Sequence, residues 1–263
     1  MKIVVFDLDE TLGYFTEFSI FWESLDKYLK NNYKYILSQN DFDAILDLFP
    51  EFLRPNIINI LTYLKEKKQS TCCHKMMIYT NNTGPKTWSN HIISYFENKI
   101  HYKLIDQVIS AFKINGKTIE ICRTTHNKTH KDLIRCTKIP ETAEICFLDD
   151  TFYPDMANDN IYYINVKPYY YDLEFHYMIT QFKESNIGIK LLKNNCDDEF
   201  DSKMMEQIMY YKYKCIDKKI KDYEIDKIIG KQIIKHLHDF FKTKRNKTIR
   251  KTSHIKNKTK KNN

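Results

Sequence analysis

The sequence has no long uninterrupted run of apolar residues. None approaches the ~18 residues that a membrane-spanning helix needs. The apolar segment at the N-terminus covers only residues 3–6 and meets an acid at Asp7. A secretory signal needs a longer apolar stretch and a cleavage site. We therefore expect a protein that acts inside a cell, in cytoplasm or nucleus, without contacting a membrane.

The sequence also has little glycine, little proline and no zinc-type cysteine spacing. It contains 5 Gly, 6 Pro and 7 Cys among 263 residues, and the cysteine number is odd. No two cysteines form a C-x-x-C pair, so the usual zinc motif is excluded. We expect free thiols in a reducing compartment. With 42% hydrophobic and 14% aromatic residues, the chain is expected to form a packed core.

The charge is concentrated at one end of the chain. Ten of the 42 basic residues lie in 242–263, which has no acidic residue, and 32 basic residues face 34 acidic ones elsewhere. This tail has almost no apolar content, so we expect it to be disordered. It is either a solubilising terminus of an AT-biased sequence or an arm that contacts nucleic acid or directs nuclear import.

The body alternates short apolar runs with helical patterns. Four apolar runs suit strands that are buried on both faces: residues 3–6, 76–79, 145–148 and 161–164. Helical spacing is found between and around them: about 15–30, 41–48, from 54 onward, and 85–98. This alternation predicts an α/β fold with a doubly wound, Rossmann-like parallel sheet. We expect one α/β domain over 1–192, a polar linker at 193–202 and C-terminal helices over 203–241.

Polar side chains follow three of the predicted strands, at the edge where such sheets bind ligands. Asp7 and Asp9 follow the first strand, Thr80 ends the second, and Asp149 and Asp150 end the third. Close carboxylates can bind a divalent cation and divide the work of attack and proton transfer. The threonine hydroxyl can hold a phosphoryl oxygen, although it can equally cap the next helix.

An acidic cluster of this kind needs a cation beside it. Lys128 and Lys131 precede the third of these strands on a predicted helix. A lysine there would neutralise a phosphate and keep Asp7 ionised. Either side chain could instead lie on a solvated helix face.

In this order, the motifs resemble those of the haloacid dehalogenase (HAD) superfamily of phosphohydrolases. Within it, the sequence is similar to the RNA polymerase II carboxy-terminal-domain (CTD) phosphatases and NLI-interacting-factor-like phosphatases, especially the forms carried by large DNA viruses. The matching segments lie within about 1–185: Asp7 to Leu12, Leu53 to Pro55, Ile78 to Asn82, Lys131 to Leu133, Cys136 to Pro140, and Leu148 to Asp150.

The resemblance implies a role for each matching residue. Asp7 would be the nucleophile and Asp9 the general acid and base. Lys131 matches the motif lysine, with Lys128 as the second candidate. The remaining site residues would bind the substrate phosphate (Thr80, Asn81 and Thr11) or Mg²⁺ (Asp7, the main-chain carbonyl of Asp9, Asp149 and Asp150).

The expected activity is Mg²⁺-dependent hydrolysis of a phosphomonoester through an aspartyl-phosphate, by a HAD-type fold with a small or minimal cap. A protein serine/threonine phosphatase of the CTD type fits the resemblance best. The alternatives are a phosphatase for nucleotides or nucleic-acid ends and a catalytically silent binding module. The Asp-Asp-Thr sequence at 149–151 and the segment 82–127 depart from the cellular enzymes, which leaves the substrate surface open.

Overall fold

A computed structural model describes residues 1–193, 198–216, 218–242 and 253–254. The chain forms two compact units. Unit 1 combines residues 1–12, 54–169 and 221–263, and unit 2 combines 13–53 and 170–220. Of the predicted disordered tail at 242–263, only Lys242 and the pair at 253–254 are described, so the rest of that prediction lies outside the described residues.

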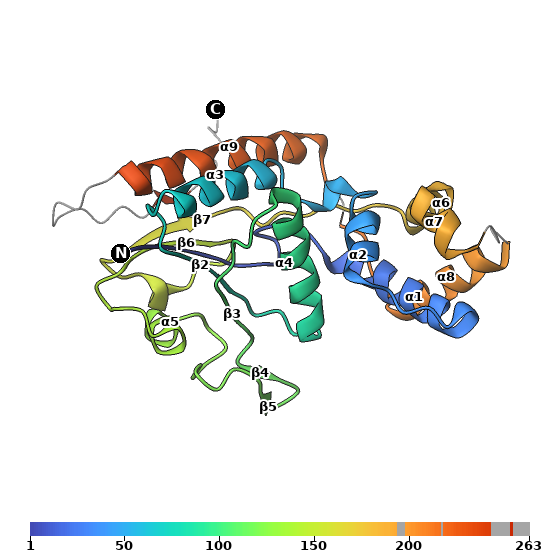
Figure 1. Ribbon diagram of the computed structural model, residues 1–263, viewed down its shortest axis with the longest axis horizontal. Coiled ribbons are helices and arrows are strands. Elements are labelled where there is room, and N and C mark those ends of the chain that lie inside the picture. Colours follow the sequence, from blue (N-terminus) through green and yellow to red (C-terminus); the bar gives the residue numbers. More distant parts are fainter. Residues whose placement is uncertain (194–197, 217, 243–252, 255–263) are drawn as a thin grey trace, which may run out of the picture. The chain divides into compact units, whose positions relative to one another are not determined.

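Unit 1 is built on a parallel sheet with the strand order β3-β2-β1-β6-β7, to which the short β8 is added (Figure 1). The strands are β1 (Lys2–Phe6), β2 (Lys75–Tyr79), β3 (Gln107–Ile109), β6 (Glu144–Asp149), β7 (Ile161–Asn165) and β8 (Ser253–His254). The four predicted strands are confirmed. The sequence analysis missed β3, which has only three residues, and β8, which falls within the tail predicted to be disordered.

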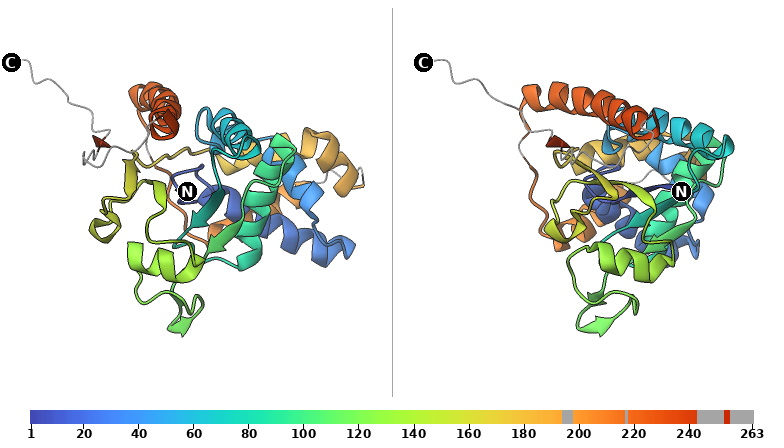
Figure 2. Two further views of the ribbon diagram at one scale, coloured as in Figure 1. Left: turned by 60° about the vertical axis from the view of Figure 1, so that its left-hand side comes forward. Right: turned by 90° about the vertical axis from the view of Figure 1, so that its left-hand side faces the viewer.

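The strands are apolar on both faces because helices cover both. Successive side chains of a strand point to opposite faces. One face contributes Ile3, Val5 and Phe147 to a core that includes Leu133 of α5 (His130–Thr137). On the other side of the sheet, α3 (Ile57–Gln69) and α9 (Ile220–Lys242) lie side by side (Figures 1 and 2). The ring of Tyr63 on α3 stacks on His238 of α9, with 4.5 Å between centroids.

The connection from β3 to α5 contains a small hairpin. Its strands are β4 (Lys113–Ile114) and β5 (Lys117–Thr118), paired antiparallel. Asn115 and Gly116 join them, with φ angles of 49° and 78°. Positive φ at both turn residues suits the right-handed twist of a two-residue hairpin, and Asn-Gly is the pair that adopts it most readily. This hairpin was not anticipated. The remaining helix of unit 1 is α4 (Lys86–Ile100), with the 3₁₀ turn η2 (Pro154–Met156).

Unit 2 is helical. It contains α1 (Thr16–Tyr33), α2 (Gln39–Leu46), η1 (Pro50–Phe52), α6 (Phe175–Glu184), α7 (Asn186–Leu191) and α8 (Asp198–Tyr210). Phenylalanine rings fill its centre: Phe18 packs edge-on against Phe42, and Phe21 packs against Phe182. Tyr28 of α1 also contacts Phe200 of α8, at 4.8 Å between ring centroids.

The predicted domain boundaries differ from this arrangement. The sequence analysis placed a linker at 193–202, but α8 begins at Asp198, and residues 194–197 lie outside the described part. It also placed 1–192 in one domain, whereas both units combine distant segments. Helical periodicity shows where a helix forms, but not which distant helix covers its apolar face. Among the described helices, none is both long and apolar enough to cross a lipid bilayer.

Candidate active site

The candidate site lies where the strand order of the sheet reverses. From β1 the chain proceeds outward to β2 and β3, and then returns to place β6 on the other side of β1. Crossovers on either side of such a point leave a crevice at the carboxyl ends of the strands. The backbone N–H of Asp7 donates to the carbonyl of Leu148 over 2.9 Å. The residues that follow β1 and β6 therefore meet there, as the sequence predicted.

Three carboxylates come together at this point. Ligand atoms of Asp7, Asp149 and Asp150 all lie within 4.8 Å of one another. Asp7 and Asp149 are buried, with 6% and 1% exposure, and Asp150 is half-buried. The backbone N–H of Thr151 donates to Asp149 Oδ1 over 2.9 Å. The cluster is thus built into the protein interior.

Thr11 supports Asp150. Its hydroxyl donates to Asp150 Oδ1 and accepts from the backbone N–H of Asp150, both over 3.2 Å. Thr11 itself is 1% exposed. This pairing orients Asp150, so the structure gives no support to the predicted role of Thr11 in phosphate binding.

The lysine at the site is Lys128. Its Nζ donates to Asp149 Oδ2 over 2.6 Å and also to Asp7 Oδ1, and the residue is 1% exposed. Lys128 precedes α5, whose N-cap is Thr129. Lys131 lies in the first turn of α5 and is exposed. The sequence analysis preferred Lys131, with Lys128 as the second candidate. The structure places Lys128, and not Lys131, against the carboxylates, because the segment before the helix brings it there.

The cluster carries more negative than positive charge. With all groups ionised, three carboxylates and one ammonium leave a net charge of −2. Burial alone would lower the pKa of Lys128, but Asp7 and Asp149 outweigh it and raise that pKa above its ordinary value. Burial raises the pKa of Asp149, although Lys128 opposes this shift. A divalent cation would compensate the remaining charge and keep the carboxylates ionised.

The donor set fits Mg²⁺. All three side chains offer oxygen ligands, which Mg²⁺ prefers, and it needs few of them because it retains water molecules. The carboxylate of Asp9 is not part of this group. Its predicted contribution, through the main-chain carbonyl, stays a prediction.

Asp9 has a different environment from the three clustered acids. Burial and the charge of Asp7 raise its pKa to about 6, while a hydrogen bond from Asn82 lowers it. Asn82 Nδ2 donates to Asp9 Oδ2 over 2.8 Å. The other atom of the amide, Oδ1, accepts from the backbone N–H of Gly84 over 2.8 Å, which fixes the orientation of the amide. The sequence analysis did not assign a role to Asn82.

Thr80 and Asn81 follow β2 at the same edge of the sheet. Thr80 is 2% exposed, and its hydroxyl accepts from the backbone N–H of Asn82 over 2.9 Å. Helix α4 begins at Lys86, with Pro85 as its N-cap, so Thr80 does not cap it. Asn81 Nδ2 donates to the hydroxyl of Tyr153 over 3.0 Å. The Tyr153 ring lies 5.4 Å from Lys128 Nζ, which places Asn81 close to the site.

Two buried arginines hold the surrounding backbone. Arg54 donates to the carbonyl of Thr11 over 2.6 Å and to that of Lys167 over 2.9 Å. Arg123 donates to the carbonyls of Thr80 and Ser110 over 3.1 and 2.8 Å. The sequence analysis included Arg54 in a matching segment at the start of a helix without giving it a role, and it did not consider Arg123. Arg54 follows Phe52 and Leu53, which gave a weak sign of burial, whereas the neighbours of Arg123 gave none.

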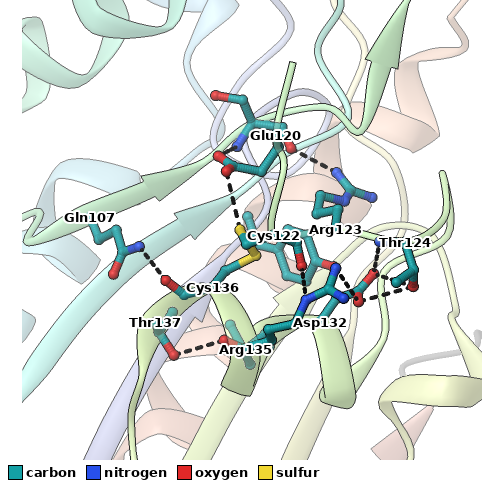
Figure 3. Close-up of a disulfide and its surroundings, with 12 residues drawn as sticks. Gln107, Glu120, Cys122, Arg123, Thr124, Asp132, Arg135, Cys136 and Thr137 are labelled. Atoms are coloured by element: carbon teal, nitrogen blue, oxygen red, sulfur yellow. Dashed lines mark hydrogen bonds and ion pairs between the residues drawn. A yellow bond between two sulfur atoms is a disulfide. The ribbon is translucent and has the colours of Figure 1, made fainter. Parts of the chain in front are cut away.

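Cys122 and Cys136, which lie on either side of Lys128 in the sequence, form a disulfide (Figure 3). This corrects the expectation that all cysteines are free thiols. Among the described cysteines, four others are free: Cys72, Cys73, Cys146 and Cys215. The two bonded residues are 14 positions apart, and sequence spacing gave no sign that the fold brings them together.

Comparisons of the chain with family models, curated proteins and solved structures found no match.

Proposed function

We propose that this protein is a Mg²⁺-dependent phosphomonoester hydrolase that uses Asp7 as its nucleophile. The observation that carries the proposal is the buried group of Asp7, Asp149, Asp150 and Lys128 at the point where the strand order reverses. Placing two buried acids and one half-buried acid around one lysine is costly unless a cation compensates the excess negative charge. A bound Mg²⁺ would supply that charge.

Each residue of the group has a defined task. Lys128 contacts Asp7 and supplies positive charge for the transferring phosphoryl oxygens. Asp149, Asp150 and Asp7 would hold Mg²⁺, which supplies further positive charge to those oxygens when bound. Asp7 attacks phosphorus in line with the leaving oxygen and forms an aspartyl-phosphate. Water then hydrolyses this intermediate.

Asp9 is the proposed proton donor and acceptor. A pKa of about 6 lies close to neutral pH, where one group can both donate and accept a proton. Asp9 would protonate the leaving alcohol in the first step and remove a proton from the attacking water in the second. Thr80 and Asn81, at the end of β2, are proposed to contact the phosphate.

The finer proposal is a protein serine/threonine phosphatase of the HAD type, similar to the CTD phosphatases. It rests on the resemblance of the motifs around Asp7, Thr80 and Asp149. A nucleic-acid end is the alternative substrate, favoured by the ten basic residues within 242–263. A phosphoserine peptide and a 5′-phosphorylated oligonucleotide, compared at equal concentration, separate the two.

The test of the proposal is hydrolysis of an aryl phosphate by the full chain. The wild type should turn over in Mg²⁺, stop in EDTA and recover when Mg²⁺ is returned. Asp7→Asn should be inactive with native circular dichroism. Asp155→Asn, in η2 outside the group, is the matched control and should retain activity. Wild-type activity that survives EDTA, or an active Asp7→Asn variant, would refute the proposal.

A further inference from the structure

The disulfide closes the segment of the chain that carries Lys128. Cys122 follows the β4–β5 hairpin, and Cys136 lies near the end of α5, with 5.0 Å between their Cα atoms. Lys128 lies between them, so residues 122–136 form a closed loop, here called the Lys128 loop. Figure 3 shows the cross-link beside the polar side chains of this loop. The proposed catalytic lysine is therefore held in a covalent ring.

Polar contacts set the path of the chain inside that ring. Asp132 Oδ2 accepts from the backbone N–H of Thr124 over 2.8 Å, and both of its oxygens accept from the Thr124 hydroxyl over 3.0 Å. Arg135 Nε donates to the carbonyl of Cys122. A single hydrogen bond of this kind contributes little net stability because water competes for its partners. The disulfide is the contact in the loop that water cannot replace.

The surroundings of the disulfide also favour its reduction. Both cysteines are only half-buried, so a small thiol can approach them. Glu120 Oε1 lies 3.1 Å from Cys122 Sγ. A sulfur in a disulfide has no hydrogen to donate, so this contact becomes a hydrogen bond only after reduction, when the Cys122 thiol can donate to the carboxylate. The site thus has an acceptor ready for the reduced state.

We propose that the Cys122–Cys136 disulfide is a reversible redox cross-link that controls the position of Lys128. When it is closed, the Lys128 loop holds the Nζ atom against Asp7 and Asp149. When it is open, the ends of the loop separate more freely, and Lys128 occupies this position for a smaller fraction of the time. The consequence for turnover rests on the proposed function, whereas the consequence for the loop does not.

The exchange that opens the cross-link needs a dithiol as reductant. One thiolate of the dithiol attacks Cys122 Sγ, and the S–S bond breaks to release Cys136, which takes up a proton. The second thiolate attacks the mixed disulfide and releases Cys122, which is protonated beside Glu120. The protein disulfide gains two electrons and two protons, and the dithiol becomes a disulfide.

Hydrogen exchange of the full chain tests the proposal, with dithiothreitol as the reductant and oxidised glutathione as the oxidant. Mass spectrometry of alkylated peptides first reports whether residues 122 and 136 are linked. Reduction should speed amide exchange in the Lys128 loop on the order of 10- to 100-fold. Exchange in α3 should stay the same. Turnover of an aryl phosphate in Mg²⁺ should fall by about tenfold.

Two double variants serve as controls. Cys122→Ser/Cys136→Ser should behave as the reduced protein under both conditions. Cys72→Ser/Cys215→Ser removes two exposed free thiols and should retain the full response. Failure of the pair to link under oxidising conditions, or equal loop exchange in both states, overturns the proposal. Loop exchange that responds in a protein without phosphatase activity supports the cross-link and refutes the proposed function instead. Metal-dependent activity in a protein whose loop exchange does not respond to reduction supports the proposed function and refutes the redox cross-link.

Discussion

The two units bury carboxylates in contrasting ways. In unit 1, Asp7 and Asp149 lie against the ammonium of Lys128. In unit 2, Glu17 of α1 is fully buried, and its Oε2 accepts from the backbone N–H of Leu173 over 2.8 Å. Burial raises the pKa of Glu17 to about 8, and the contact with Leu173 offsets this only in part. Near neutral pH, Glu17 is therefore largely protonated.

This contrast separates buried acids that lie against a cation from a buried acid that accepts from a backbone N–H. A buried carboxylate remains ionised only where a cation or several donors stabilise it. The group of Asp7, Asp149, Asp150 and Lys128, here called the strand-end group, carries an excess of negative charge that a metal ion would compensate. Glu17 avoids that requirement by holding a proton. The difference explains why burial of an acid alone does not mark a catalytic site.

The largest expected effect comes from removing the cation that defines the strand-end group. Lys128→Met should lower turnover of an aryl phosphate by at least about 100-fold, because it removes a preorganised charge from the transition state. Lys131→Ala, at an exposed position of α5, is the control and should stay within about twofold of the wild type. Steady-state kinetics in saturating Mg²⁺ measures both.

Folding of the lysine variant needs its own check, since loss of one partner from a buried ion pair can cost 3–5 kcal/mol or so. Circular dichroism and thermal unfolding in Mg²⁺ show whether the variant is native at the assay temperature. A native Lys128→Met protein with wild-type turnover, or a larger loss in Lys131→Ala, would remove the distinction between paired and neutral acids.

An intermediate effect is expected at Asn82, which holds the carboxylate of the proposed proton donor, Asp9. Asn82→Ala removes the hydrogen bond to Asp9 Oδ2 and should slow turnover about tenfold. The loss should be greater for an alkyl phosphate than for a nitrophenyl phosphate, because a poor leaving group depends more on proton donation. Thr83→Ala, at the next and exposed position, is the control. An equal loss on both substrates would refute a positioning role for Asn82.

The last prediction concerns stability, not turnover, and tests the buried acid of unit 2. The folded-state pKa of Glu17 is raised from 4.5 to about 8, so its contribution is present below pH 4.5 and is lost as pH rises through 8. Over that window, the free energy of unfolding of the wild type should fall by up to about 1.4 kcal/mol per pH unit relative to Glu17→Gln. Urea unfolding in Mg²⁺ at several pH values measures this difference. Parallel pH profiles for the two proteins would show that Glu17 is ionised in the fold.

The sequence predicted the sheet well because its central strands are buried on both faces. That burial requires continuous apolar runs such as 3–6 and 145–148, and their ends carry Asp7, Asp149 and Asp150 to one edge. Predicting which lysine lies at the carboxylates was harder, because the choice between Lys128 and Lys131 depends on the path of a loop. In the structure, that path brings Lys128 to Asp7, which is 121 positions away in the sequence.

Unit 2 was the least predictable part for the same reason. Its helices were recognisable by their spacing, as for α1 and α2. The assembly of α1 with α8 depends on contacts such as Tyr28 with Phe200, more than 150 residues apart in the chain. The sequence of neither helix indicates which distant helix it packs against. Glu17 likewise contacts Leu173, which is distant in the sequence, so sequence reasoning could not distinguish this buried residue from an exposed acid at the start of a helix.

The central claim is that Asp7 forms a covalent phosphoryl intermediate. Asp9→Asn should slow hydrolysis of that intermediate, since the base for the second step is lost, and an aryl phosphate should load the protein within the first turnover. Peptide mass spectrometry after a rapid quench at low pH then identifies the modified residue. We predict a phosphoryl group on the peptide that contains Asp7, present with Mg²⁺ and absent with EDTA or in Asp7→Asn/Asp9→Asn. Phosphate release by an active wild type with no such adduct in the Asp9→Asn variant, or an adduct on another residue, would contradict the account.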